Sequence, residues 1–134
     1  MRAGDTYIRA GKHVPSDPHL WVIISDPAQN RQKLVAVNLT SQRTDKEQTC
    51  VIQPGEHPFV TKESVVMYAG ATVVSEAMIL SAKQAGMLRF PPAVSQGLLQ
   101  RIRAGAQRSI RLPTAARRVL IDQGLIAIDD DPRK

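Results

Sequence analysis

Short hydrophobic runs dominate the first 80 residues, and β-branched side chains are frequent in them. Residues 20–25 read LWVIIS and stop at Asp26-Pro27. This run is too short for an ordinary helix and predicts a buried strand. A polar turn leads into KLVAVNLT at residues 33–40. That second run predicts a strand that forms a hairpin with the first.

Other short runs extend the β pattern on both sides of this hairpin. They are residues 6–8, 49–52, 64–69 and 71–79, with Gly70 between the last two and polar loops at 11–18 and 41–48. The chain therefore contains about five or six short strands at a spacing of roughly ten to fifteen residues. This rhythm is typical of a small barrel rather than of βαβ units.

Beyond residue 80 the hydrophobic pattern becomes helical. Pro91-Pro92 are placed to open a helix, in which Val94, Leu98 and Ile102 recur every four residues and form an apolar stripe. A second helix is predicted at 115–123 and ends at Gly124. The last six residues, 129–134, are expected to fray.

The predicted fold class is mainly β with C-terminal helices, an α+β protein. We expect a β-barrel of five or six short strands at 1–80, and a basic helical extension with two helices at 81–134, packed on the same domain.

Length and composition favour one soluble, cytoplasmic domain. The chain has 134 residues, of which 43% are hydrophobic and 22% charged, as in ordinary globular proteins. No apolar run reaches the roughly 18 residues of a membrane span, and the polar start lacks the apolar core of a signal peptide. Cys50 is the only cysteine, which excludes an intrachain disulfide, and we expect it to be a small strand residue.

Charge is distributed unevenly along the chain. The net charge is +6, yet residues 1–76 are balanced, and residues 77–121 contain seven arginines and one lysine without a single acid. Because the arginine fork binds phosphate or carboxylate bidentately, this stretch predicts a surface for a polyanion, either nucleic acid or an acidic protein segment. The alternative is a solvated helix face that confers solubility. The candidate RNA contacts on the predicted helix are Arg101, Arg103 and Arg108.

Several catalytic motifs are absent from the sequence. GxxxxGK[ST], GxGxxG, HExxH and GxSxG do not occur, which argues against nucleotide hydrolysis, dinucleotide chemistry and zinc proteolysis. We predict no cofactor and no metal. The candidates that remain are polar residues at strand ends and in a PGEHP turn: His19, Thr40, Ser41 and His57.

These candidates suit cleavage of RNA through its own 2′-hydroxyl. If the two histidines share one rim of the barrel, they can act as base and acid, since histidine transfers protons in both directions near neutral pH. The hydroxyls would bond the phosphoryl oxygens, and Arg43 or Lys62 would stabilise the charge and bind RNA. Structural alternatives stand beside each assignment: a histidine next to proline often holds a turn, and Thr40 and Ser41 can simply end a strand.

The hairpin and the strands after it resemble the core of the MazF/PemK/Kid toxins. The resemblance covers roughly residues 4–80, and the strand end VNLTS at 37–41 matches the family's Thr-Ser ending. It implies a small SH3-like barrel, a homodimer, and metal-independent cleavage of single-stranded RNA through a 2′,3′-cyclic phosphate. It also implies a toxin–antitoxin system with an acidic antitoxin protein as partner. His19-Leu20 stands where the family has a catalytic Arg-Pro pair.

Three hypotheses therefore remain open at the level of sequence. The first is a toxin-like endoribonuclease that uses the four candidate residues. The second is a noncatalytic nucleic-acid-binding or protein-binding adaptor on the same barrel, in which the histidines are structural. The third is a phage or plasmid accessory protein that acts only through protein contacts.

Overall fold

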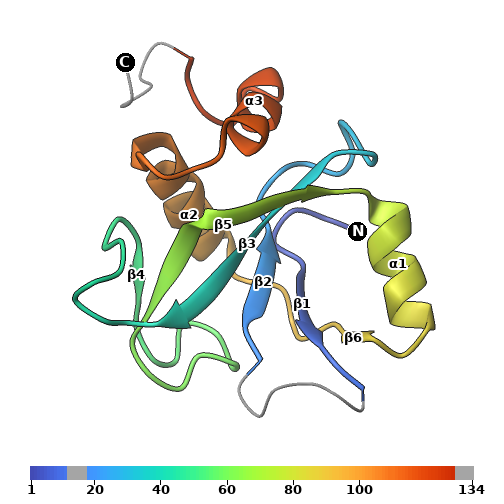
Figure 1. Cartoon of the computed structure of the whole chain (residues 1–134), viewed down its shortest axis with the longest axis horizontal. Helices are drawn as coiled ribbons and strands as arrows, with labels where there is room; N and C mark the ends of the chain where they lie inside the picture. Colours follow the sequence, from blue (N-terminus) through green and yellow to red (C-terminus); the bar gives the residue numbers. More distant parts are fainter. Residues whose placement is uncertain (12–17, 129–134) are drawn as a thin grey trace.

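A computed structural model describes residues 1–11 and 18–128, in which one antiparallel sheet of six strands is accompanied by three helices (Figure 1). The elements in chain order are β1 (Thr6–Arg9), β2 (Leu20–Ile23), β3 (Leu34–Ser41), β4 (Val51–Ile52), β5 (Ser64–Val74), α1 (Glu76–Gln84), β6 (Leu88–Arg89), α2 (Gln96–Arg108) and α3 (Thr114–Asp122). The predicted α+β class is confirmed. The predicted frayed end at 129–134 and most of the loop predicted at 11–18 lie outside the described residues.

The sheet is open at both ends of its strand order. That order is β4-β5-β3-β2-β1-β6, so the predicted barrel is not closed by pairing between its edge strands. The boundary predicted at residue 80 falls within α1, and β6, beyond that boundary, pairs with β1. None of the helices in the described parts of the chain is long and apolar enough to cross a membrane.

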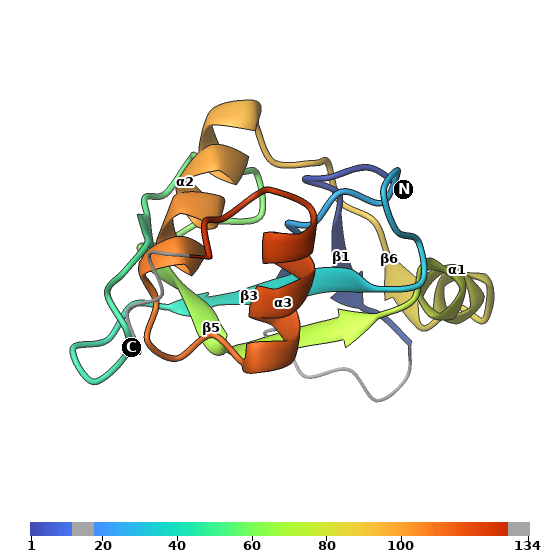
Figure 2. The same cartoon turned by 90° about the horizontal axis from the view of Figure 1, so that it is seen from above.

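The central strand, β3, is buried on both of its faces. Val35 and Val37 belong to a core that includes residues of α2 and α3, whereas Leu34 and Ala36 pack in a second cluster with Ile79 of α1. Because alternate side chains of a strand point to opposite faces, an unbroken apolar run is what two covered faces require. Figure 2 shows α3 lying across the middle of β3 and β5, with α1 at one end of the molecule beside β6.

The predicted hairpin is formed by β2 and β3. Leu20 pairs with Leu39, and Ile23 pairs with Ala36. The Oγ atom of Ser25 accepts a hydrogen bond of 2.8 Å from the backbone N–H of Val35 at the turn end of the hairpin. The register places the first residue of β2 beside the last residues of β3.

The prediction of two strands separated by Gly70 is wrong. The chain continues as a single strand, β5, through Gly70, and the segment after Val74 is helical. Gly70 instead lies in a bulge, since the pairing with β3 shifts register between Asn38–Met67 and Ala36–Thr72. Helix α1 begins where Ser75 caps it, its Oγ accepting from the N–H of Met78 at 3.1 Å.

Both predicted C-terminal helices are present, and the apolar stripe predicted for the first of them is buried. Leu98 and Ile102 of α2 are buried, as is Val94 just before it. The helix starts later than predicted, with Ser95 as its N-cap, because residues 91–94 form an extended segment that bonds to the N-terminal strand region through Thr6 and Gly4. Gly124 follows α3 with a φ of 72°, a left-handed conformation that favours glycine.

Candidate functional site

A pocket of about 260 Å³ opens where β3 ends. The start of β2, the end of β3, the loop after β3 and the segment before β5 all contribute to it. The hairpin register explains part of this arrangement, since Leu20 pairs with Leu39 and β5 closes the other side through the Ser64–Ser41 pair. Five of the residues predicted from the sequence line this pocket: His19, Thr40, Ser41, Arg43 and Lys62.

His19 lines the pocket, and within the described part of the chain only one of its ring nitrogens has a hydrogen-bond partner. Its Nδ1 lies 3.2 Å from the backbone oxygen of Leu39. A carbonyl oxygen can only accept a hydrogen bond, so Nδ1 carries the proton and the neutral ring keeps the lone pair of Nε2 available. The side chain is exposed. This is the orientation that a general base requires.

Lys46 is a pocket residue that the sequence analysis missed. Its Nζ donates to the Oγ1 of Thr40 at 2.9 Å and to the backbone oxygen of Ser41 at 2.8 Å. The Thr40 hydroxyl accepts this bond and keeps its own proton to donate. The sequence contains little signal for Lys46, because it lies in a polar loop of ordinary composition. The loop folds back on the end of β3 and so places the Lys46 ammonium group beside Thr40 and Ser41.

The pocket carries a concentration of positive charge. Arg43 reaches Asp45 at 3.3 Å, and both side chains are mostly exposed. The ammonium group of Lys62 has no hydrogen-bond or ion-pair partner among the described residues. With Lys46, three cations line the pocket, and no carboxylate does so within the described part of the chain. Such a site attracts an anion, and it suits phosphate because its ammonium and hydroxyl groups can all donate hydrogen bonds.

His57 does not belong to this pocket. Its side chain is 2% exposed. Its Nδ1 accepts from the backbone N–H of Phe59 at 3.0 Å, so its Nε2 carries the proton and donates to the backbone oxygen of Pro92 at 2.6 Å. Both ring nitrogens are occupied by backbone groups. His57 therefore ties the turn that supplies Phe59 and Lys62 to the segment before α2, and the structure does not bring the two histidines together.

The three predicted arginines on α2 contact backbone carbonyls of the sheet region rather than the pocket. Arg101 donates to the oxygen of Val51 at 2.7 Å, Arg103 to that of Ile24 at 2.7 Å, and Arg108 to that of Thr49 at 3.3 Å. Burial lowers the pKa of Arg103 below its ordinary value. These side chains hold α2 against the strand ends.

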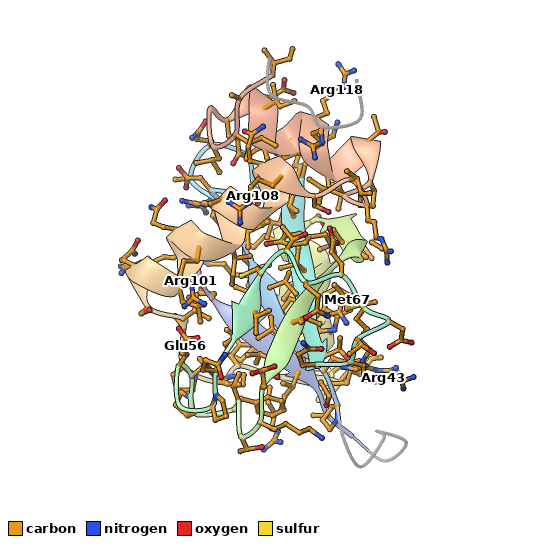
Figure 3. The ribbon with its side chains drawn as sticks, turned by 90° about the vertical axis from the view of Figure 1, so that its left-hand side faces the viewer. Arg43, Glu56, Met67, Arg101, Arg108 and Arg118 are labelled. Carbon is orange, nitrogen blue, oxygen red and sulfur yellow. The ribbon has the colours of Figure 1, made fainter. Side chains whose placement is uncertain are left out.

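Arg101 also forms an ion pair with Glu56, as Figure 3 shows at the labelled pair. The hydrogen bond from Arg101 lowers the pKa of the Glu56 carboxyl, with a further contribution from the backbone N–H of Gln53. The pair joins α2 to the turn that contains His57. That turn leads to Phe59 and Lys62, which line the pocket.

Residues that could hold a metal are not grouped in the structure. No cluster of three or more His, Cys, Asp or Glu side chains occurs among residues 1–11 and 18–128. Cys50 is buried, and burial raises the pKa of its thiol. The arrangement that remains is one imidazole, three cations and four hydroxyls, those of Thr40, Ser41, Thr61 and Ser64, around one pocket.

Comparison with known proteins adds no assignment. No family model matches this chain, and no curated protein is detectably similar to it.

Proposed function

We propose that the protein is a toxin-like, metal-independent endoribonuclease that cleaves single-stranded RNA at the pocket where β3 ends. The observation that supports it is the composition of that pocket: a histidine with a free Nε2, the hydroxyls of Thr40 and Ser41, and three cations without a described carboxylate. The proposal retains the SH3-like barrel as the fold of the family it resembles. It also retains cytoplasmic location, a homodimer and an acidic antitoxin protein as partner.

The reaction assigns a separate role to each group. The Nε2 of His19 removes the proton from a ribose 2′-hydroxyl, and the 2′-oxygen attacks the adjacent phosphorus. Lys46 and the hydroxyl of Thr40 stabilise the charge on the phosphoryl oxygens. The bond to the 5′-oxygen then breaks, and the ammonium group of Lys62 protonates the leaving oxygen. The products are a 2′,3′-cyclic phosphate and a 5′-hydroxyl end.

This assignment differs from the sequence hypothesis in its acid. His57 is committed to two backbone hydrogen bonds, so a lysine replaces it in the reaction. Arg101, Arg103 and Arg108 each donate to a carbonyl of the protein. A guanidinium has five N–H donors, so the exposed Arg101 and Arg108 keep donors with which to bind RNA phosphates outside the pocket.

Cleavage of a long single-stranded RNA in EDTA tests the proposal. The protein should produce cyclic phosphate ends, and a substrate with 2′-deoxyribose at the cleavage position should stay intact. His19→Ala should reduce the rate by about 10²-fold or more. Lys83→Ala is the matched control, since this lysine lies on α1 over the ring of Phe90. An unchanged rate in His19→Ala, or intact RNA throughout pH 5–9, would exclude this mechanism.

A noncatalytic adaptor is the second candidate, and one observation favours it. Only one of the two candidate histidines has a free ring nitrogen in the pocket. An adaptor would bind RNA or an acidic protein at the same cations without cutting. Binding of intact RNA that weakens steeply with salt, without any cleavage, would identify it.

A further inference from the structure

A second pocket lies at the other end of β3, away from the candidate site. Its volume is about 400 Å³, and it is enclosed by the β2–β3 turn, the end of β5 and one side of α3. The eight residues of β3 span about 26 Å at 3.3 Å per residue. Figure 3 places Arg118, which lines this pocket, and Arg43, which lines the first one, at opposite ends of the molecule.

Two cations from different elements line this pocket. Lys33 comes from the residue before β3, and Arg118 comes from the exposed side of α3. Neither side chain has a hydrogen-bond or ion-pair partner within the described residues. One carboxylate, Asp122, accompanies them. The arginines of α2 donate to backbone carbonyls, whereas Lys33 and Arg118 have no such acceptor within residues 1–11 and 18–128.

Side-chain amides add hydrogen-bond donors to the same wall. The Oε1 of Gln123 accepts from the N–H of Asp26 at 2.7 Å, which fixes the orientation of the amide. Its Nε2 is then buried without a hydrogen-bond partner. The Oδ1 of Asn30 accepts from the N–H groups of Gln32 and Lys33 at 2.9 and 3.2 Å. In both amides the protein uses the oxygen, and among the described residues neither nitrogen has a hydrogen-bond partner, but that of Gln123 is buried.

The turn and the helix end are fixed relative to each other. Gln29 donates from its Nε2 to the backbone oxygen of Gln123 at 3.3 Å, in addition to the bond between Asp26 and Gln123. Val73, which is 36% exposed, supplies apolar surface on the β5 side. One wall of the pocket is therefore fixed by hydrogen bonds and carries donor groups, and the wall formed by Val73 is apolar.

We propose that this second pocket binds a phosphate group that is attached to an organic body. Phosphate is an acceptor with several oxygens, so it can satisfy Lys33, Arg118 and the amide nitrogens from different directions, and it is recognised well by the arginine fork. The apolar wall suits a flat or apolar body such as a nucleoside. Reaching the buried Nε2 of Gln123 would require its amide to turn away from the N–H of Asp26, so the Nδ2 of Asn30 is the amide donor that a phosphate meets directly. The proposal goes beyond RNA cleavage and does not depend on it.

The phosphate can come from a free nucleotide or from the backbone of bound RNA. Two-dimensional amide NMR of the whole chain with AMP, adenosine, inorganic phosphate and a 2′-O-methyl RNA 12-mer distinguishes these sources. If a free nucleotide is the ligand, AMP saturates shifts at Asn30, Arg118 and Gln123 while adenosine does not. If RNA is the ligand, the 12-mer shifts these residues and AMP does not.

Variants on the two pockets decide whether the assigned residues bind. Lys33→Gln and Arg118→Gln should each weaken binding of the responding probe by about tenfold or more. Lys62→Gln, in the first pocket, should leave the AMP-induced shifts at Asn30 and Gln123 unchanged. For the RNA 12-mer the control is Lys83→Gln on α1, which lies over the ring of Phe90. All of these substitutions are at exposed side chains, and thermal unfolding checks that the fold is retained.

Two results would overturn the proposal. One is the absence of shifts at Asn30, Arg118 and Gln123 with every probe at millimolar concentration. The other is binding that Lys33→Gln and Arg118→Gln leave unchanged. Neither result bears on RNA cleavage at the first pocket, which is tested separately with His19→Ala.

Discussion

At the scale of single residues, the two histidines show how differently the same side chain is used. His19 is exposed with one free nitrogen, whereas His57 is buried with both nitrogens bonded to the backbone. The sequence pattern does not separate them, because each lies next to a strand or a turn. The two histidines are distinguished by the fold around them: the turn at His57 brings backbone groups to both of its ring nitrogens, whereas His19 has one such partner among the described residues.

Replacing His57 should destabilise the fold, whereas replacing His19 should not. His57→Ala leaves the N–H of Phe59 and the oxygen of Pro92 without partners, so we expect a loss of about 2–3 kcal/mol in the free energy of unfolding. His19→Ala removes one bond at an exposed position and should stay within about 0.5 kcal/mol. Equilibrium denaturation in urea measures both. Equal losses in the two variants would contradict the assignment.

The candidate site was predictable in part. His19, Thr40, Ser41, Arg43 and Lys62 all line one pocket, because strand ends in a hairpin of known register must lie together. Lys46 was missed because no local sequence pattern shows that the loop after β3 folds back onto the end of that strand.

At the scale of elements, α2 fits the sheet at a glycine. A Cβ atom at Gly105 would overlap the hydroxyl of Tyr68. That hydroxyl donates to the backbone oxygen of Ile102 at 2.7 Å. The helix can therefore approach β5 this closely only where no side chain is present.

Gly105→Ala should therefore destabilise the protein by about 1–3 kcal/mol through overpacking. The matched control is Gly97→Ala in the same helix, where a Cβ atom meets nothing within 4 Å. That change should be neutral or stabilise by up to about 1 kcal/mol, since alanine favours helix. Thermal or urea unfolding of the two variants makes the comparison. A stabilised Gly105→Ala variant would show that the helix is not seated on Tyr68.

The Glu56–Arg101 ion pair should make the free energy of unfolding depend on pH. The pKa of Glu56 is lowered from its ordinary 4.5 in the folded state, so the folded protein binds fewer protons at this group than the unfolded chain does. The stabilisation is complete above about pH 5 and is lost as the pH falls through the lowered pKa. Glu56→Gln should therefore flatten the decline of melting temperature in acid.

Glu63→Gln is the control for this measurement, because Glu63 accepts from the amide of Gln53 and pairs with no cation among the described residues. Its acid profile should follow that of the wild-type protein. If Glu56→Gln shows the same acid decline as both, the pair does not contribute to stability.

At the scale of the whole molecule, the segment richest in positive charge does not supply the cations of the first pocket. The acid-free stretch predicted a polyanion surface, yet the three candidate arginines of α2 bond backbone carbonyls. Arg117 is buried and donates to the oxygens of Ala106 and Ser109. The cations of the first pocket come instead from residues 1–76, where the charges balance.

The salt dependence of RNA binding should follow the pocket rather than the arginine-rich stretch. Using a non-cleavable 2′-O-methyl RNA, we expect the joint change Lys46→Ala and Lys62→Ala to reduce the slope of log K against log salt. The reduction should be about 0.7 for each RNA phosphate that the variant no longer neutralises. Lys83→Ala should leave the slope unchanged. A slope that stays constant in the double variant would place the RNA elsewhere on the surface.

The sequence by itself determined the elements whose signals are local. The β-branched hairpin and the glycine-terminated α3 depend on neighbouring residues and were predicted with nearly correct bounds, and the apolar stripe of α2 was predicted although the helix starts later than expected. The extent of β5 was not, because a glycine can mark either a break or a bulge, and the register with β3 decides between them.

Tertiary structure alone decided which polar groups face solvent and which hold the fold. His57 and the arginines of α2 are bonded to backbone groups 35 to 79 residues away in the chain. Such partners depend on how the sheet and helices pack, since a buried polar group must find its hydrogen bonds wherever packing brings them. The same packing brings together the segments that line the two pockets, and no local sequence pattern shows that these segments meet.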